Sequence, residues 1–188
     1  YCTMCVVYNN ECHSIMEVIS MNLELVKAPN DWLQKKLEPM DIANLPDNLK
    51  EIKDEMNKVM VQNKGIGLSA NQVGLEMRLF IFHAEGLQAL SSQRVNLCIN
   101  PEVVEFIEPE VEMWEGCLSF PGVNLYIKRH HKIKAKWYNE LGKEVNELLY
   151  GYDARCFLHE LDHLNGITYD MHVTPMELQK AKEKAEAQ

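Results

Sequence analysis

The sequence predicts an α+β fold, in which antiparallel β-sheets pack around a central helix carrying an H-E-x-x-H pattern, with an N-terminal and a C-terminal helix. Three observations support this prediction. Helical patterns begin near Asp47, Tyr152 and Thr174. Strand-like runs fill the sequence between the first two helices. Short turns join some of these runs, and strands joined in this way pair antiparallel, as is typical of α+β domains.

Size and composition favour one compact domain. The chain has 188 residues, and 46% of them are hydrophobic, enough to build a core. The net charge of −9 argues against binding to a polyanion, so no direct nucleic-acid partner is expected. No apolar run approaches the length of about eighteen residues that a membrane span needs, so no membrane partner is expected. The scattered cysteines favour a reducing, cytoplasmic setting over a secreted disulfide scaffold.

The N-terminal segment holds a potential ligand set of its own. Cys2, Cys5, Cys12 and His13 could bind a metal ion. A structural zinc site usually pairs two knuckles across a longer loop, and no glycine shapes a turn here. An irregular tail is therefore the preferred interpretation of this segment.

The first predicted helix begins at Asp47 and ends at Gly65, after a loop-rich segment punctuated by prolines. Apolar residues recur in it at steps of three and four, which places them on one face. These residues are Leu49, Ile52, Met56, Val59 and Met60.

Strand patterns follow this helix. The candidate strands are 77–84, 95–101, 102–108, 131–138 and 143–151. Pro101 and Pro109 are expected to break the second and third of them. Residues 139–142 form a turn, which predicts a β-hairpin with Ile133, Ala135 and Trp137 on one face. The basic run 128–136 is interpreted as the solvated face of a strand.

Two helices are predicted in the C-terminal part. One runs from about Tyr152 to Leu164, with Asn165-Gly166 as its C-terminal stop. The other begins at Thr174, which can cap it, with Pro175 in the first turn and Glu177 completing a capping box.

The H-E-x-x-H pattern of the central helix is His159, Glu160 and His163. Residues four apart lie on the same face of a helix, so both histidines can hold one metal ion. Glu160 lies one step round the helix, where a general base would act on a water at the metal. Its apolar neighbours indicate a mostly buried helix, which favours a metal site over histidines that are only hydrogen-bonded.

Several residues could supply a third ligand. Gly166 matches the longer pattern that ends in a third histidine, but Tyr169 occupies that final position. His172 falls three residues too late, and Glu177 already fits a capping box. The upstream candidate is Cys117, whose thiolate would complete a Cys-His-His set with one open position.

Cys117 also has a competing interpretation, as a nucleophile paired with a histidine. The H-E-x-x-H pattern favours a metal-bound sulfur instead. Cys98 and Cys156 are expected to be small buried apolar residues.

Three segments together resemble the motifs of one family, the peptide deformylases. They are 65-GIGLSANQ-72, 115-EGCLS-119 and 159-HELDH-163, in the family's order. The resemblance runs from about residue 21 to residue 180. It implies a single catalytic domain over residues 21–188, preceded by a tail or extension at residues 1–20.

The resemblance implies hydrolysis of the N-formyl group from the N-terminal formyl-methionine of newly made polypeptides, with release of formate. Cys117, His159 and His163 would bind a divalent metal, natively Fe²⁺, with Zn²⁺, Ni²⁺ or Co²⁺ able to replace it. Glu160 would move the proton. Gln72 and the backbone N–H of Leu118 would stabilise the tetrahedral intermediate.

The same resemblance suggests how the substrate is bound. Its backbone would lie against Ile66, Gly67 and Gly116. The methionine side chain would enter a pocket, for which Phe120, Tyr152, Cys156 and the ring of His159 are the candidates by position. Asn124 falls where some members of the family carry an arginine at the edge of the pocket, which leaves the preference beyond methionine open. Ser69, Asn71, Trp114 and Leu158 also depart from the family's pattern, but none of them removes a ligand, the base or an oxyanion donor.

The implied partners are N-formylmethionyl peptides and nascent chains, with a transient contact to the ribosome. A monomer in the cytoplasm, or in an organelle's stroma or matrix, is expected. Two other readings of the motifs stay open. One is a zinc endopeptidase whose third ligand is Tyr169, His172 or Glu177. The other is a closed structural metal site, which would need a fourth protein ligand and would leave Glu160 and Gln72 without a role.

Overall fold

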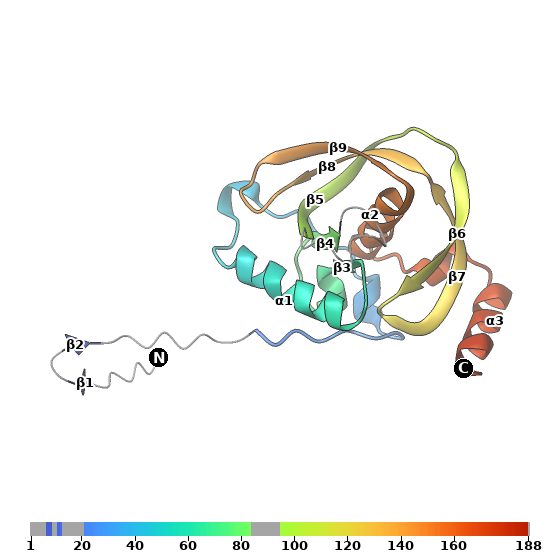
Figure 1. Ribbon diagram of the computed structural model, residues 1–188, viewed down its shortest axis with the longest axis horizontal. Coiled ribbons are helices and arrows are strands. Elements are labelled where there is room, and N and C mark those ends of the chain that lie inside the picture. Colours follow the sequence, from blue (N-terminus) through green and yellow to red (C-terminus); the bar gives the residue numbers. More distant parts are fainter. Residues whose placement is uncertain (1–6, 9–10, 13–20, 84–94, 188) are drawn as a thin grey trace.

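The computed structural model describes residues 7–8, 11–12, 21–83 and 95–187 (Figure 1). The candidate ligands in the N-terminal tail lie outside these residues, except for Cys12, whose backbone alone is described. The helices are η1 (Asp31–Gln34), η2 (Ile42–Asn44), α1 (Leu49–Gln62), η3 (Ala70–Val73), α2 (Gly151–Leu164), η5 (Tyr169–His172) and α3 (Pro175–Glu186). The strands are β1 (Val7–Tyr8), β2 (Glu11–Cys12), β3 (Gly67–Ser69), β4 (Leu79–His83), β5 (Val95–Phe106), β6 (Glu110–Cys117), β7 (Phe120–His130), β8 (Lys132–Tyr138) and β9 (Glu144–Tyr150).

Antiparallel sheets surround the helix α2. Strands β3, β4, β5, β8 and β9 form a five-stranded sheet in that order, and β6 pairs with β7 in a separate two-stranded sheet. Figure 1 shows α2 between the two sheets, with α1 beside the larger sheet and α3 outside β7. The predicted α+β class with antiparallel sheets around a central helix is confirmed.

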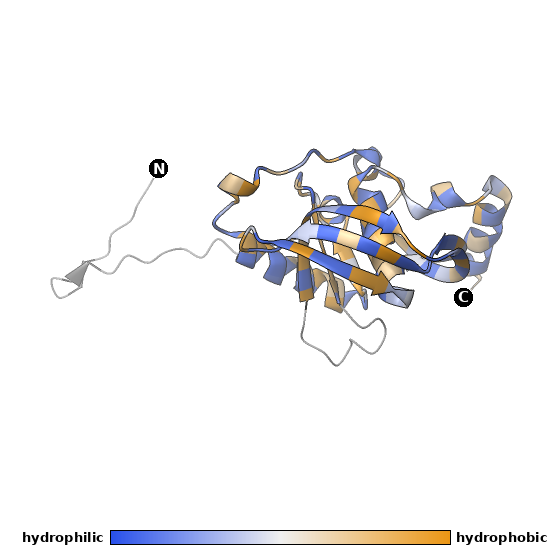
Figure 2. Ribbon diagram, turned by 90° about the horizontal axis from the view of Figure 1, so that it is seen from above, coloured by the Kyte–Doolittle hydropathy of each residue, from blue (hydrophilic) through white to orange (hydrophobic). Residues whose placement is uncertain are grey.

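The alternation of side chains along β4 explains how the larger sheet is covered on both faces. Leu79 and Ile81 point to one face and pack with the apolar side of α1. Phe80 and Phe82 point to the other face and pack with α2, where Phe157 meets both rings at centroid distances of 5.1 and 6.4 Å. A strand buried on both faces reads as a continuous apolar run, as residues 79–82 of β4 do. Figure 2 shows hydrophobic and hydrophilic residues alternating along the strands that face the viewer.

Helix α1 follows the predicted pattern, because the five apolar residues expected on one face are all buried. Its end is set by Lys64, which has a left-handed backbone at φ 59°. The N–H of Gly65 then donates to the carbonyl of Met60 at 2.9 Å, which closes the helix. Gly65 therefore follows the left-handed residue and is not that residue itself.

The predicted break at Pro101 is wrong, because β5 continues through it from Val95 to Phe106. The pairing with β8 is irregular between Ile99 and Glu102, and Asn100 has a left-handed backbone at φ 49°. The side chain of Asn100 bonds the N–H and the carbonyl of Met40, both at 2.8 Å. Proline is tolerated at such an irregularity, where the ladder needs no donor.

The predicted β8–β9 hairpin is confirmed, and Ile133, Ala135 and Trp137 are buried on one face. The reading of 128–136 as a solvated face is wrong at Arg129. This side chain is only 5% exposed and lies between two carboxylates described below. A strand-period pattern does not reveal that a charged residue has buried partners.

The C-terminal elements match the prediction closely. Helix α2 begins at Gly151, and Gly166 follows its end at φ 73°. A Cβ on Gly166 would collide with the backbone carbonyl of Gln34, so glycine is required here for packing. Helix α3 has the predicted capping box between Thr174 and Glu177. None of the helices in the described ranges has the length and apolar character needed to cross a membrane.

Candidate active site

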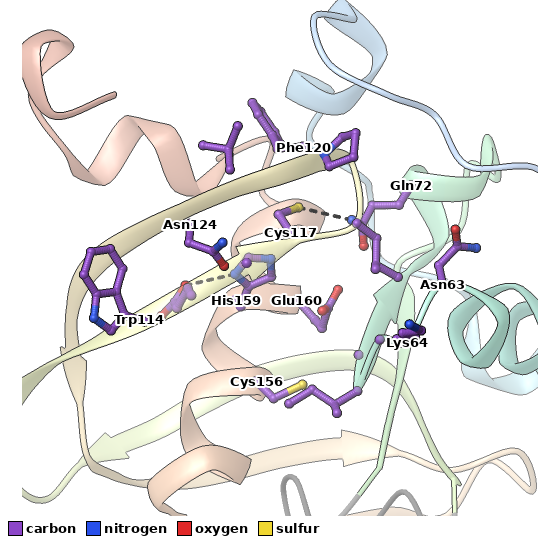
Figure 3. A pocket seen from close by; sticks show the side chains of 18 of the residues that line it. Asn63, Lys64, Gln72, Trp114, Cys117, Phe120, Asn124, Cys156, His159 and Glu160 are labelled. Atoms are coloured by element: carbon purple, nitrogen blue, oxygen red, sulfur yellow. Dashed lines mark hydrogen bonds and ion pairs between the residues drawn. The ribbon is translucent and has the colours of Figure 1, made fainter. Parts of the chain in front are cut away.

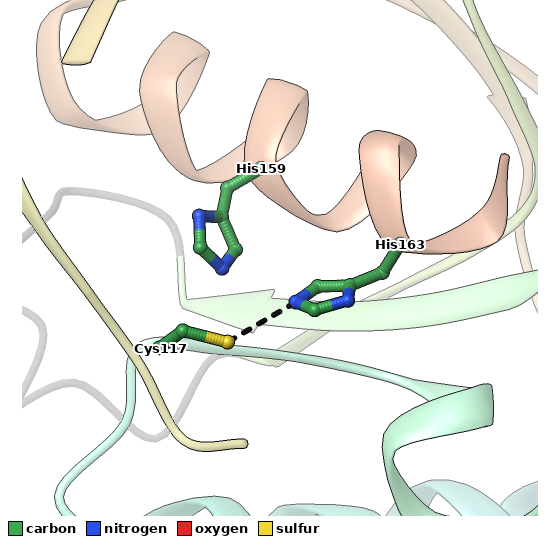
Figure 4. Close-up of side chains that lie close together, drawn as sticks. All are labelled: Cys117, His159 and His163. Atoms are coloured by element: carbon green, nitrogen blue, oxygen red, sulfur yellow. Dashed lines mark hydrogen bonds between the residues drawn. The ribbon is translucent and has the colours of Figure 1, made fainter. Parts of the chain in front are cut away.

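Three side chains from two elements converge at the centre of the molecule (Figure 4). His159 and His163 lie one turn apart on α2, and Cys117 ends β6. The ligand atoms of the three residues all lie within 4.8 Å of one another. The sulfur of Cys117 is 3.3 Å from Nε2 of His163, and all three residues are buried. The fold therefore brings a distant thiol to the two histidines of the H-E-x-x-H pattern.

The chemistry of this donor set fits a transition metal. A thiolate and two imidazoles suit Zn²⁺ or Fe²⁺, and three protein ligands leave one position for water or substrate. Such donors need a cation to offset the cost of burying a thiolate. Among the described residues, Nδ1 of His163 has no hydrogen-bond partner. Cys117, His159 and His163 are therefore a group that could hold a metal ion.

The other candidates for the third ligand are engaged elsewhere. The hydroxyl of Tyr169 donates to the carbonyl of Val123 at 2.8 Å. Nε2 of His172 lies 2.7 Å from a carboxylate oxygen of Asp162. Glu177 caps α3. These contacts direct all three side chains to structural roles and favour Cys117.

Glu115 fixes the orientation of His159. Its Oε2 lies 3.0 Å from Nδ1 of His159, and its Oε1 accepts from Arg129 and Arg155 at 2.6 Å each. Burial opposes ionisation of Glu115, but the bonds from His159 and Arg129 outweigh it and hold its pKa well below the ordinary value. An ionised Glu115 keeps the proton on Nδ1 and leaves Nε2 free for a metal.

The sequence reasoning did not identify Glu115 as functional. No local sequence pattern marks it, because its partners Arg129 and Arg155 are buried only through contacts between distant segments. Arg129 also bonds Asp162 at 2.6 Å, and Asp162 bonds His172. This chain of charges ties β6, β7 and η5 to the helix that carries both histidines.

Glu160 lies beside the three candidate ligands and points into the same cavity (Figure 3). Its Oε2 is buried and has no hydrogen-bond partner among the described residues. Burial raises the pKa of Glu160 to about 7. A bound divalent cation would lower that pKa again, because it favours the carboxylate. The carboxylate therefore lies where it could exchange a proton with a group in the cavity.

Gln72 is held so that its amide nitrogen faces Cys117. Its Oε1 accepts from the backbone N–H and the hydroxyl of Ser69, both at 3.0 Å. Its Nε2 lies 3.1 Å from the hydroxyl oxygen of Ser119 and 3.5 Å from the sulfur of Cys117. The carbonyl end is thus anchored, and the donor end is directed to the site (Figure 3).

Gly67 permits β3 to approach α2 closely at the site. A Cβ at this position would come within 2.5 Å of Oε1 of Glu160 and 2.6 Å of the sulfur of Cys156. Real Cβ atoms do not approach other atoms so closely, so only glycine fits without displacing one of them. The first motif is therefore packed directly against the carboxylate of the third.

A cavity of about 620 Å³ opens in front of these groups. Its lining includes every residue expected to bind substrate, together with Leu118: Ile66, Gly67, Gly116, Phe120, Tyr152 and Cys156. Figure 3 shows Phe120 and Cys156 on opposite sides of Cys117 and His159. The ring of Phe120 also packs on Tyr169 at a centroid distance of 5.1 Å.

Comparisons with known proteins agree with the motifs and the geometry. The family described as polypeptide deformylase matches residues 22–179. A peptide deformylase of Thermotoga maritima is 40% identical over 145 residues, which is 76% of this chain and 82% of that protein. One of Aquifex aeolicus is 36% identical over 149 residues, covering 78% and 84%.

Solved structures give the same result. A peptide deformylase of Synechococcus elongatus in complex with actinonin superposes with a TM-score of 0.80 at 30% identity, covering 87% of this chain and 88% of that one. One of Legionella pneumophila gives a TM-score of 0.79 at 27% identity, covering 89% and 95%. Family motifs, sequence relatives and structural neighbours therefore agree that the chain belongs to the polypeptide deformylases, enzymes that remove the N-formyl group from nascent polypeptides.

Proposed function

We propose that this chain hydrolyses the formyl group of N-terminal formyl-methionine with a divalent metal held by Cys117, His159 and His163. The observation that carries the proposal is the convergence of these three side chains beside Glu160, in one cavity. Residues 21–188 would form the catalytic domain, with residues 1–20 as an extension.

The metal is proposed to be Fe²⁺ natively, with Zn²⁺, Ni²⁺ or Co²⁺ able to replace it. A mixed sulfur and nitrogen donor set supports this range of metals. When bound, such a metal supplies Lewis acidity, which lowers the pKa of water and polarises a carbonyl oxygen.

Glu160 is proposed to accept the proton of the attacking water and to pass it to the departing amine. Its buried carboxylate, with one oxygen free of hydrogen bonds among the described residues, supports this role. Breaking the formamide bond leaves formate and a free amino terminus, so the proton must reach the nitrogen as the bond breaks. One carboxylate that takes and returns the proton meets both needs.

Gln72 and the backbone N–H of Leu118 are proposed to stabilise the negative charge that develops on the formyl oxygen. The anchored carbonyl of Gln72 supports this role, because its amide nitrogen needs no reorientation during the reaction. A neutral donor that is positioned in advance is typically worth about 3–4 kcal/mol in the transition state.

The remaining assignments concern the substrate. Its backbone is proposed to lie against Ile66, Gly67 and Gly116. Phe120, Tyr152 and Cys156 are proposed to contact the methionine side chain. Since Phe120 and Cys156 lie on opposite sides of the metal ligands, they would contact it from different directions. Nascent chains, a transient ribosome contact, a monomeric state and a cytoplasmic or organellar location complete the proposal.

The test is formate release from formyl-Met-Ala-Ser by the protein loaded with a single divalent metal, compared with Glu160→Ala. We expect the variant to keep its metal and to lose activity by about 10²–10⁴-fold. Glu112→Ala, on the exposed side of β6, is the control and should retain activity. If Glu160→Ala is as fast as the parent with metal bound, the assignment of the base is wrong. Cys117→Ala should lose the metal, and stoichiometric metal in that variant would refute the ligand set.

A further inference from the structure

An aromatic pair lies on the open face of the β6–β7 sheet. Trp114 and Tyr126 are direct partners across the two strands, and their ring centroids are 5.1 Å apart. Trp114 is nevertheless 63% exposed and Tyr126 is 50% exposed. The ammonium of Lys184, from α3, lies 5.9 Å from the Trp114 ring centroid. The tryptophan is thus supported by two neighbours while most of its surface remains open.

The pair continues the wall of the catalytic cavity. Trp114 lines that cavity, as do Gly116 and Asn124, which form the next cross-strand pair on the same face of the sheet. Figure 3 places Trp114 at the far end of this wall from Gln72. Three residues of strand, about 10 Å, separate Trp114 from Cys117.

That separation matches the length of a short extended peptide. The proposed substrate passes Gly116 with its formyl carbon beside Cys117. The third residue of an extended chain lies roughly 10 Å from the formyl carbon. Its side chain would therefore reach the level of Trp114.

We propose that Trp114, backed by Tyr126, binds the side chain of the third substrate residue and favours large apolar or aromatic side chains there. This inference rests on the proposed deformylase function and adds a preference beyond methionine. Exposed tryptophans supported by neighbours are frequent anchors of binding surfaces, because a rigid ring offers a large contact area. Lys184 beside the ring disfavours a substrate lysine or arginine at that place, since like charges repel.

The test compares formyl-Met-Ala-Phe, formyl-Met-Ala-Ser and formyl-Met-Ala-Lys by initial rates of formate release. For the parent we expect kcat/KM to be about three- to tenfold higher for the phenylalanine peptide than for the serine peptide, with lysine no better than serine. Trp114→Ala should bring the phenylalanine to serine ratio to about 1. The change should appear in KM, because the contact is the same in the ground and transition states. Trp114→Phe should retain part of the ratio.

Phe106→Ala is the matched control, because Phe106 is an exposed aromatic that also packs on another ring but lies outside the cavity lining. This variant should keep the parent's ratio. A ratio near 1 in the parent, or a Trp114→Ala variant that slows both peptides equally, would overturn the contact site while leaving deformylation intact. Absence of formate release from formyl-Met-Ala-Ser by the metal-loaded parent would instead overturn the proposed function, and this inference with it.

Discussion

Oε2 of Glu115 lies 3.0 Å from Nδ1 of His159, on the side of the ring away from Cys117 and His163. Glu115→Gln removes the anion that holds this ring and its proton. Losing such an outer partner typically weakens metal binding by about 10–100-fold. We expect a loss of that size in a titration against a competing chelator.

The same substitution leaves Arg129 and Arg155 buried without their shared anion. Breaking a buried pair in this way costs about 3–5 kcal/mol, so the metal-free variant should unfold at a lower urea concentration. Glu112→Gln, on the exposed side of the same strand, should change neither property. Unchanged metal affinity in Glu115→Gln would show that the hydrogen bond does not orient His159.

Gln72→Glu tests the proposed donor to the formyl oxygen. The substitution is almost isosteric, but it puts an oxygen where Nε2 now lies, 3.5 Å from the sulfur of Cys117. We expect kcat for formyl-Met-Ala-Ser to fall by about 10²–10³-fold, with KM changing much less, because the interaction forms only in the transition state. Gln62→Glu, at the end of α1, is the control. Equal losses in kcat and in substrate affinity would point to a binding role instead.

Gly67→Ala tests the close packing of β3 on α2. The added methyl must displace both Glu160 and Cys156, whose nearest side-chain atoms lie 2.5 and 2.6 Å from the ideal Cβ position. We expect a stability loss of about 1–3 kcal/mol, and a fall in kcat greater than the fraction of unfolded protein can explain. Gly74→Ala is the control. Its φ of 77° strains the backbone of an alanine, but no atom lies within 4 Å of the ideal Cβ position. A Gly67→Ala variant with normal kcat would show that the carboxylate tolerates displacement.

The elements predicted well from the sequence are those governed by local patterns. The apolar spacing of α1 and the alternation of Ile133, Ala135 and Trp137 both reflect which side of an element faces the core. The capping residues of α3 act within one turn, so their effect can also be read from the sequence. The motif His159, Glu160 and His163 is local for the same reason.

The features missed by the sequence reasoning depend on contacts between distant segments. Pro101 continues a strand because the side chain of Asn100 reaches back to Met40. Arg129 is buried because β6 and α2 supply carboxylates on either side of it. The role of Glu115 depends on the same buried charges, so no local pattern in the sequence reveals it. A charged residue predicts an exposed side chain, and a proline predicts the end of a strand, only where no contact with a distant segment compensates for the charge or the missing donor.

The buried carboxylate of Glu160 should destabilise the metal-free protein above neutral pH. Its folded pKa of about 7 lies above the ordinary value of 4.5, so the unfolded chain loses this proton first as pH rises. The resulting loss in the free energy of unfolding is absent below about pH 4.5 and grows up to about pH 7. It is then constant, at about 1.4 kcal/mol per unit of pKa difference.

The Glu160→Gln variant cannot ionise at this position, so it does not suffer this loss of stability. We therefore expect the metal-free variant to be more stable than the metal-free parent at pH 8 by a few kcal/mol, and similar to it at pH 4, in urea unfolding. Glu112→Gln should show no such pH-dependent gain, since Glu112 is exposed. Equal stability of Glu160→Gln and the parent at pH 8 would show that water reaches the carboxylate and relieves its burial.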